Sequence, residues 1–409
     1  MNPVTSTGLS SERCMELEAK YGTRNYQPIP VVIARGEGVW VWDLEDNKYL
    51  DCLAGYSALN QGYGHPRILE AARAQLDTGV ALTSRAFFNT RLGELCEKIT
   101  KLSGFDRALP MCSGAEAVET AIKISRKHAY TRRGIADGTA KIIAFENNFH
   151  GRTTTIVGFS SEMQYREHFG PFAPGFEVLP YGDANALRKA VDGRTAAVLI
   201  EPIQGEGGVI VPPAGYLAEV QAICRESGAL LVLDEIQSGL GRTGKLFAYE
   251  HEKGVKPDLM LLAKALTGGM YPLSVVLGRE EVMDVLDPGD HGSTYGGAPY
   301  GAAVAIAALD VLVEERLVEN AARLGAVLLK ELRAMGSPHV ELVRGRGLWA
   351  GVVIKKSSGP AKAFVKKLAA EGILCKETHE QVLRISPPLV ITRDELDWAL
   401  ARFAKVLAA

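Results

Sequence analysis

Several ionisable side chains lie directly after short apolar segments of the sequence. Asp234 and Glu235 follow ALLVL, Glu201 follows AAVLI, and Lys264 follows DLMLLA. Such apolar segments are typical of strands buried on both faces of a sheet. A charge at the end of a buried strand is costly unless it is paired, so these groups either reach solvent or meet a charged ligand. In an open parallel sheet, ligands bind at that end of the strands.

Two further segments give Lys264 and Asp234 a specific chemistry. The turn 113–115 (SGA) lies between the predicted strand ALPMC and a predicted helix, and the segment 291–297 reads HGSTYGG. A lysine amine can form a Schiff base with an aldehyde cofactor, and a carboxylate can keep a pyridine nitrogen protonated. A turn of small residues at a helix N-terminus can bind a phosphate group. Together these properties indicate pyridoxal phosphate (PLP) as the cofactor.

A second glycine-rich motif, 239–244 (GLGRTG), matches the GxGxxG fingerprint of dinucleotide-binding proteins. Its context does not fit that function. The fingerprint should follow its strand directly and open a long helix, with an acidic residue about 20 positions further on. Here the residues DEIQS separate the motif from its strand, and the segment that follows is short and broken. The sequence therefore favours PLP over a nicotinamide cofactor.

The elements that must position these residues follow from the hydrophobic pattern. Residues 30–51 alternate apolar and polar side chains in short runs, which predicts a β-meander. From about residue 66 to 280, apolar strands alternate with helices, which predicts an α/β domain around a mainly parallel sheet. A long amphipathic run over 303–335 leads into a mixture of strands and helices. We expect three parts: 1–65 with the β-meander, a large α/β domain (66–315) and a small α+β domain (316–409). The strands of the large domain are expected at ALPMC, KIIAF, AAVLI, ALLVL, DLMLL and 274–278.

Composition excludes several classes of protein. The 409 residues include 46 basic and 48 acidic side chains, for a net charge of -2, which gives no electrostatic reason to expect a nucleic-acid partner. The six cysteines show no spacing typical of a zinc site, so we expect free thiols and no metal. The N-terminus resembles no targeting signal, and the longest uncharged stretch, 291–309, begins with loop-forming residues. We therefore expect a cytoplasmic protein that is not bound to a membrane.

Eight segments of the chain match the motifs of one known family, in the same order. They are GEGVWVWDLEDNKYLDCLAGYSALNQGYGHP, SGAEAVETAIKISRK, NNFHGRT, EPIQGEGGV, LLVLDEIQSGLGRTG, LLAKALTGGMYPLS, HGSTYGGAPYG and RGRGL. Through them the chain resembles the class III aminotransferases, which are PLP enzymes of fold type I, over nearly its whole length. The resemblance implies an α/β fold in which a large domain holds a mainly parallel seven-stranded sheet between helices, with a small α+β domain built from both chain ends. It also implies a PLP-dependent transaminase that forms a homodimer or a larger homo-oligomer.

The resemblance implies catalytic and ring-binding roles residue by residue. Lys264 corresponds to the lysine that forms the Schiff base and moves a proton. Asp234 corresponds to the acid that holds the pyridinium proton, and Gln237 to a contact with the phenolic oxygen. Phe149 would lie against the cofactor ring. His150 follows it in the cofactor site, where animal members that use ornithine carry a Trp.

The resemblance also implies a phosphate site. Ser113 stands where animal members that use ornithine have a threonine-containing turn, and the main chain of Gly114 and Ala115 would bind the phosphate. Ser293 and Thr294 would complete this site from the partner subunit. Because the site takes residues from both subunits, a homodimer is the smallest assembly that the resemblance predicts.

Within the family, the likeness is greatest to members that use ornithine. It implies transfer of the δ-amino group of L-ornithine to 2-oxoglutarate, giving glutamate and glutamate 5-semialdehyde, which cyclises to pyrroline-5-carboxylate. Tyr26 and Arg152 would bind the α-carboxylate of ornithine, and Tyr56 is characteristic of the members that use it. Glutamate would place its α-carboxylate on Arg384 and its γ-carboxylate on Arg152. Glu206 would cover Arg384 while ornithine is bound.

Two alternatives stay open at this point. An enzyme for acetylornithine or another ω-amino acid would use the same machinery. A catalytically silent scaffold could keep the fold, although the intact set of lysine, aspartate and arginine side chains argues against it.

Overall fold

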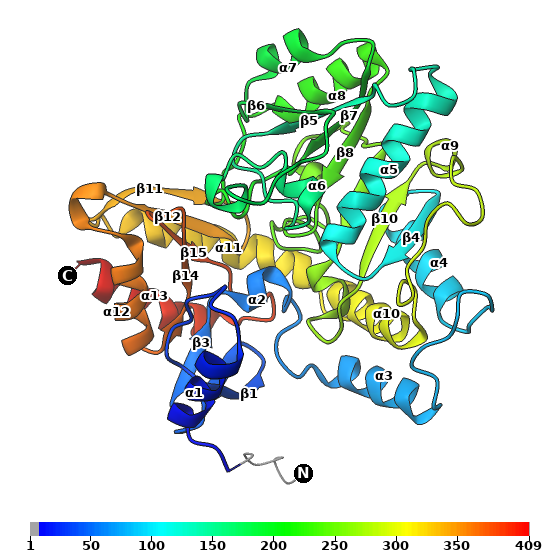
Figure 1. Ribbon diagram of the computed structural model, residues 1–409. Helices are drawn as coiled ribbons and strands as arrows, with labels where there is room; N and C mark the ends of the chain where they lie inside the picture. Colours follow the sequence, from blue (N-terminus) through cyan, green and yellow to red (C-terminus); the bar gives the residue numbers. More distant parts are fainter. Residues whose placement is uncertain (1–7, 409) are drawn as a thin grey trace.

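A seven-stranded sheet forms the centre of the computed structural model, which describes residues 8–408 (Figure 1). Residues 1–7 and 409, at the ends of the expected N-terminal and C-terminal parts, lie outside the described residues. The order of the sheet is β4-β10-β9-β8-β7-β5-β6; β10 is antiparallel to β4 and β9, and the other pairs are parallel. The expected α/β fold with a mainly parallel seven-stranded sheet is confirmed. Its strands are β4 (Arg107–Met111), β5 (Lys141–Phe145), β6 (Phe176–Leu179), β7 (Thr195–Ile200), β8 (Leu230–Asp234), β9 (Leu259–Leu262) and β10 (Ser274–Gly278).

Helices cover both faces of this sheet. Alternate residues of a strand point to opposite faces. In β8, Leu230 and Val232 pack with α5 (Gly114–Arg132), whereas Leu231 and Leu233 pack with α8 (Tyr216–Ser227). Both faces must therefore be apolar, which explains the uniformly apolar strands. The other helices of this region are α3 (Pro66–Asp77), α4 (Leu92–Ser103), α6 (Thr154–Val157), α7 (Ala184–Ala190), α9 (Glu280–Met283) and α10 (Pro299–Glu314), with short 3-10 turns η1 (Met163–Tyr165), η2 (Ala248–His251) and η3 (Lys264–Thr267).

Two four-stranded sheets are built from the ends of the chain. The first contains the predicted β-meander, and a C-terminal strand adds to it in parallel. Its strands are β1 (Ile33–Glu37), β2 (Trp40–Asp43), β3 (Lys48–Asp51) and β13 (Ile373–Leu374). The second has the order β11-β12-β15-β14, with β11 (Val340–Gly345), β12 (Ala350–Ile354), β15 (Val382–Ile385) and β14 (Lys376–Thr378). The helices beside them are α1 (Ser11–Tyr21), α2 (Ala54–Ser57), α11 (Leu317–Ala334), α12 (Ala361–Ala370) and α13 (Arg393–Ala408), with η4 (Lys356–Ser358).

The amphipathic run expected over 303–335 forms two helices in the structure. The run is divided into α10 and α11, because Arg316 adopts a left-handed conformation with φ 55° that ends regular helix. α10 then packs against α3, whereas α11 packs against α13 and β11. We propose that the domain boundaries lie at residue 315, in this turn, and at residue 65, immediately before α3. Within residues 8–408, no helix combines the length and the apolar character needed to span a membrane.

The glycine-rich segment 239–244 connects the three parts of the chain. Arg242 from this segment is fully buried. Its guanidinium donates to the carbonyl oxygens of Leu348 (2.9 Å) and Pro387 (2.6 Å), and to Oδ1 of Asn60 (2.5 Å). These partners belong to the C-terminal and N-terminal parts of the chain. The segment therefore ties the domains together and does not open a long helix, in agreement with the prediction against a dinucleotide site.

Candidate active site

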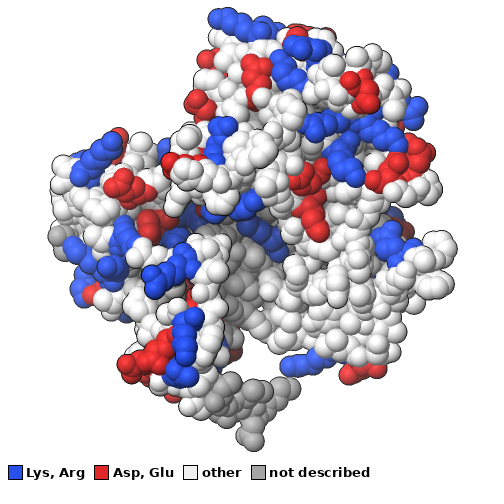
Figure 2. Space-filling view, viewed as in Figure 1, with Lys and Arg blue, Asp and Glu red and all other residues white. Residues whose placement is uncertain are grey.

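Two adjoining cavities lie at the carboxyl ends of the central strands, where the sequence predicts a site. The inner cavity has a volume of about 420 Å³ and the outer cavity about 870 Å³; Phe149 and Lys264 line both. Figure 2 shows a hollow between the large domain and the terminal parts of the chain, with Lys and Arg side chains inside it. The outer cavity is lined by Tyr26, Tyr56, Arg152 and Glu206. The inner cavity is lined by Ser113, Gly114, Ala115, Phe149, His150, Asp234, Gln237 and Lys264.

The predicted phosphate turn caps α5. Ser113 Oγ accepts a hydrogen bond from the main-chain N–H of Glu116 (3.2 Å), and the Glu116 carboxylate accepts from the N–H of Ser113 (3.0 Å). Because the helix begins at Gly114, the N–H groups of Gly114 and Ala115 have no carbonyl partner within it. Both residues line the inner cavity, so the positive end of the helix dipole is available to an anion there. A Cβ atom at Gly114 would lie 3.1 Å from Ile236 Cδ1, which explains the small residue.

Lys264 follows β9 and begins the turn η3, with a positive φ of 43°. This backbone conformation is uncommon for a lysine, and such strain is typical of functional sites. Burial lowers the pKa of the Lys264 ammonium, while the negative charges of Glu206 and Asp234 oppose that shift. A lowered pKa increases the fraction of neutral amine, which is the nucleophilic form.

His150 and Asp234 form a buried pair in the wall of the inner cavity. His150 Nδ1 lies 2.7 Å from Asp234 Oδ2, and the two side chains are 0% and 4% exposed. Burial alone would lower the pKa of His150, but the hydrogen bond to Asp234 and the charges of Asp234 and Glu201 raise it. The other carboxylate oxygen, Asp234 Oδ1, accepts from the N–H of Ile236 (3.0 Å). This pairing, which the motifs do not reveal, fixes the orientation of the Asp234 carboxylate.

Glu201, at the end of β7, is a further buried carboxylate of the inner cavity. It accepts hydrogen bonds from the N–H groups of Phe149 (3.0 Å) and Gly205 (3.4 Å). Burial and the charge of Asp234 raise the pKa of Glu201 to about 7, although His150 acts in the opposite direction. The sequence places this charge at a strand end but gives it no role. In the structure it positions the segment that carries Phe149.

Arg152 lies in the outer cavity above aromatic rings. Its guanidinium carbon is 3.8 Å from the centre of the Tyr165 ring and 5.5 Å from that of Phe149. This stacking orients the guanidinium plane, so that its remaining donors can bind a carboxylate. Tyr26 lines the same cavity and is 68% exposed. Tyr165 was not predicted, because it belongs to no recognisable motif and meets Arg152 only after folding.

Arg384 forms an ion pair with Glu206, the residue that the resemblance pairs with it. Arg384 lies in β15 with its side chain 1% exposed, and its Nη1 donates to Glu206 Oε1. Gln237 Nε2 donates to the same Glu206 oxygen (3.1 Å). Burial would raise the pKa of Glu206, but the charges of Arg384 and Lys264 and these hydrogen bonds lower it. The carboxylate of Glu206 therefore compensates the buried guanidinium of Arg384.

Tyr56 stands on a left-handed turn at the edge of the outer cavity. Residues 54–57 all have positive φ, with Tyr56 at 61°. Left-handed backbone costs roughly 1–2 kcal/mol for each non-glycine residue. The turn places the Tyr56 ring 4.8 Å from the Arg384 guanidinium carbon, and Gln237 Nε2 donates to the Tyr56 carbonyl (3.2 Å). Tyr56 is thus a neighbour of the Glu206–Arg384 pair.

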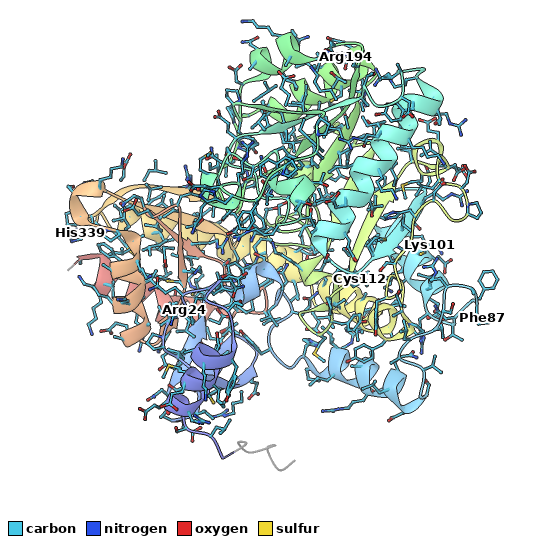
Figure 3. The ribbon with its side chains drawn as sticks, viewed as in Figure 1. Arg24, Phe87, Lys101, Cys112, Arg194 and His339 are labelled. Atoms are coloured by element: carbon cyan, nitrogen blue, oxygen red, sulfur yellow. The ribbon has the colours of Figure 1, made fainter. Side chains whose placement is uncertain are left out.

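Ser293 and Thr294 line neither of the two cavities in this single chain. Ser293 Oγ lies 3.0 Å from Cys112 Sγ, immediately before the phosphate turn; Figure 3 shows Cys112 near the base of α5. Their action from a partner subunit stays a prediction. Within the described part of the chain, no group of three or more His, Cys, Asp or Glu side chains could hold a metal ion.

Comparison with known proteins assigns the family. The family model described as Aminotransferase class-III matches residues 21–407. An ornithine aminotransferase of Geobacillus sp. is 51% identical over 394 residues, which are 96% of this chain and 98% of that protein. The structure of an ornithine aminotransferase from Toxoplasma gondii, described with partial occupancy of PLP at its active site, matches with a TM-score of 0.96 and 45% identity over 97% of this chain and 94% of that one. An acetylornithine aminotransferase from Elizabethkingia anophelis matches with a TM-score of 0.88 and 44% identity over 98% and 99%. The chain belongs to the class-III aminotransferases.

It is a PLP-dependent transaminase, and its inner cavity fits this cofactor. The fit rests on the donor set that lines a single cavity. Free N–H groups at the start of α5 suit a phosphate, Asp234 suits a protonated pyridine nitrogen, and Lys264 supplies an amine for the aldehyde. Groups for the three functional parts of the cofactor are therefore brought together as expected.

Substitution of Gly205 tests whether activity depends on the hydrogen bonds of Gln237 to Glu206 and to the Tyr56 carbonyl. A Cβ atom there would lie 1.6 Å from Gln237 Oε1 and 2.7 Å from the Trp349 ring. Gly205→Ala must therefore displace Gln237 from Glu206 and Tyr56, and we expect kcat/KM to fall on the order of 100-fold, as for other small misplacements of a site. Steady-state kinetics of the PLP-loaded enzyme measure this effect. Gly193→Ala is the matched control, since a Cβ atom there meets no atom within 4 Å. An unchanged kcat/KM in Gly205→Ala would contradict the argument.

Proposed function

We infer that the protein is an ornithine aminotransferase, which moves the δ-amino group of L-ornithine to 2-oxoglutarate. The relatives named above at about half identity support this activity over nearly the whole chain. The observation that carries the inference is the Glu206 cover on Arg384 beside Tyr56. An enzyme that accepts both ornithine and glutamate must hide one carboxylate-binding arginine from the first substrate and offer it to the second.

We propose the following roles around Lys264. When bound, PLP supplies the electron withdrawal that makes a proton on the amine-bearing carbon removable. Lys264 Nζ then takes that proton, from Cδ of ornithine or from Cα of glutamate, and a lowered pKa suits it as a base. Asp234 would hold the proton of the pyridine nitrogen, with its carboxylate oriented by His150. Phe149 would lie against the ring, and Gln237 would contact its phenolic oxygen.

Ornithine binds by its α-carboxylate to Arg152 and Tyr26. Arg152 is held above the Tyr165 ring at one side of the outer cavity, and Lys264 lines the junction of the two cavities. A substrate fixed at Arg152 therefore extends its δ-amine toward Lys264, with Tyr56 along its path. Since Glu206 neutralises Arg384, the α-carboxylate of ornithine meets one available guanidinium and is oriented in one direction.

Glutamate reacts through its α-amine, so its α-carboxylate must lie closer to Lys264. Arg384 accepts it once Glu206 swings away, while Arg152 binds the γ-carboxylate. Glu206 and the incoming carboxylate carry the same charge, so Arg384 stays paired throughout the exchange. This exchange avoids leaving a buried guanidinium uncompensated, which would cost several kcal/mol.

The choice of donor tests the substrate assignment. We expect kcat/KM for L-ornithine to exceed that for N-acetylornithine at least 100-fold, with 2-oxoglutarate as acceptor. Tyr56→Phe should reduce the ornithine value about tenfold, the effect of one lost hydrogen bond, and leave the N-acetylornithine value nearly unchanged. Phenylalanine keeps the ring that packs beside Arg384 and adds no branching to the left-handed turn. If the enzyme preferred N-acetylornithine, its activity would instead be that of an acetylornithine aminotransferase.

Substitution of the Glu206–Arg384 pair tests the exchange. Glu206→Ala should accelerate the glutamate half-reaction relative to the ornithine half-reaction at least tenfold, because Arg384 is uncovered. Arg384→Gln should do the reverse, costing glutamate about 2–5 kcal/mol for a lost buried charge contact. Single-turnover kinetics of each half-reaction measure both effects. Glu377→Gln is the control, since Glu377 lines the outer cavity, as Glu206 does, but makes no ion pair with Arg384. Equal effects on both half-reactions would exclude the exchange.

We also propose that the enzyme is a homodimer that works in the cytoplasm. Phe87 and Phe88 are 73% and 105% exposed, and Figure 3 shows Phe87 projecting away from the chain. Figure 2 shows few charges over the neighbouring surface of α3 and α10. Exposed aromatic side chains on a surface poor in charge are typical of a subunit interface. The six cysteines are free thiols, as in proteins of reducing compartments.

Sedimentation tests the dimer. The protein should sediment at twice the chain mass of 44.0 kDa. The double variant Phe87→Glu/Phe88→Glu should dissociate, because it places charges in an apolar interface, and should lose activity if Ser293 and Thr294 act across subunits. Leu342→Glu, on the exposed edge of β11, is the control. A monomeric wild-type enzyme with full activity would refute the shared site.

A further inference from the structure

A third cavity, with unusual charge, lies between the large domain and the C-terminal domain. Its volume is about 630 Å³, and we call it the basic cavity. It shares no lining residue with the inner or the outer cavity. Its charged lining consists of four permanent cations and one histidine, and no Asp or Glu lines it: Lys245, His251, Arg333, Arg344 and Arg346.

These cations are not neutralised by the protein. Among the described residues, none of the four forms an ion pair with an acidic side chain. Arg344 Nε donates to the carbonyl of Gly208 (2.8 Å), and Arg333 Nε to the carbonyl of Val343 (3.3 Å). A carbonyl satisfies a donor but does not compensate the positive charge. Four like charges thus converge on one cavity in a chain whose acidic residues outnumber its basic ones.

The fifth ionisable side chain of the basic cavity, His251, is close enough to these cations for their charges to affect its pKa. His251 Nε2 lies 3.1 Å from both the carbonyl and the hydroxyl oxygen of Thr243. Burial lowers the pKa of His251, and the charges of Arg346 and Lys245 lower it further. Burial also lowers the pKa of the Arg344 guanidinium. The charges of Arg346 and Lys245 therefore act on this imidazole in the same direction as burial does.

The side chains that carry these cations belong to main-chain segments that are closely packed against one another. Three glycines of the lining bring segments into van der Waals contact: a Cβ atom at Gly347 would lie 2.3 Å from the Thr243 carbonyl carbon, and one at Gly244 would lie 2.7 Å from Ala322 Cα. At Gly345 it would lie 2.0 Å from the Trp349 carbonyl oxygen. The loop after β8, the helix α11 and the end of β11 are thus packed backbone to backbone. Such a scaffold keeps the cations together despite their repulsion.

We propose that the basic cavity binds a small oxyanion with at least two negative charges, such as diphosphate or a tricarboxylate. Guanidinium groups bind the paired oxygens of phosphates and carboxylates in bidentate fashion, and converging cations concentrate such ligands. A multivalent anion supplies the charge compensation that the surrounding protein lacks. A monovalent anion would neutralise only part of it and bind weakly.

Calorimetric titration of the PLP-loaded enzyme tests this proposal. Diphosphate and citrate are titrated separately, with sodium chloride at matched ionic strength as the reference. We expect saturable binding of one anion per chain for at least one of them. Binding of diphosphate alone assigns the site to phosphates, and binding of citrate alone assigns it to polycarboxylates. No saturable binding beyond the chloride reference would overturn the proposal.

Two matched double variants locate the bound anion. Lys245→Gln/Arg333→Gln removes two exposed cations of the cavity, and the affinity should fall at least tenfold. Arg323→Gln/Lys330→Gln removes two cations of α11 that do not line it, and the affinity should change less than twofold. Both should retain aminotransferase activity, which shows that they fold.

An anion that binds equally well to both variants, at the PLP phosphate site or elsewhere, would overturn the proposal without affecting the proposed activity. If Lys245→Gln/Arg333→Gln does not fold, the single variant Arg346→Gln, with at least a threefold loss expected, decides the question.

Discussion

The buried charge of Arg384 is the constraint on which the active site depends. A guanidinium that is 1% exposed costs several kcal/mol unless a carboxylate compensates it. Arg384 lies in β15 of the C-terminal sheet, whereas Glu206 follows β7 of the central sheet. Their ion pair therefore links the two domains directly beside the outer cavity, which Glu206 lines. Any substrate that displaces Glu206 must bring a carboxylate of its own, which restricts the ligands that can open this contact.

The strained turn at Tyr56 is held in place by groups that serve the same ion pair. Asp51 Oδ1 accepts from the N–H groups of Leu53 (2.7 Å) and Ala54 (3.1 Å), which fixes the start of the turn. Gln237 Nε2 donates both to the Tyr56 carbonyl and to Glu206. The left-handed conformation is thus maintained by hydrogen bonds at both ends. It places the aromatic ring beside Arg384, where a right-handed turn would direct the side chain elsewhere.

Much of the site could be predicted from the sequence because parallel strands end at the same edge of a sheet. Asp234 and Lys264 each follow an apolar strand, so their proximity was implied before any distance was known. The contacts of Tyr165 could not be predicted, because this residue lies on a short 3-10 turn and meets Arg152 only in the folded chain. The strand β6 was missed because the charge of Glu177 interrupts its apolar pattern. Motifs therefore identify residues that touch the cofactor better than those that position their neighbours.

Three buried ionisable groups line the inner cavity, and burial shifts the pKa of one of them, Glu201, far from its ordinary value. Asp234 and His150 compensate one another, whereas Glu201 is stabilised by two main-chain N–H groups and has a pKa of about 7. A carboxyl group with that pKa is partly protonated near neutral pH, so it adds less than a full negative charge beside Asp234. His150 can then remain paired with Asp234 alone. The carboxyl group of Glu201 thus carries a reduced charge near neutral pH, and it competes less for His150, whose hydrogen bond orients the Asp234 carboxylate.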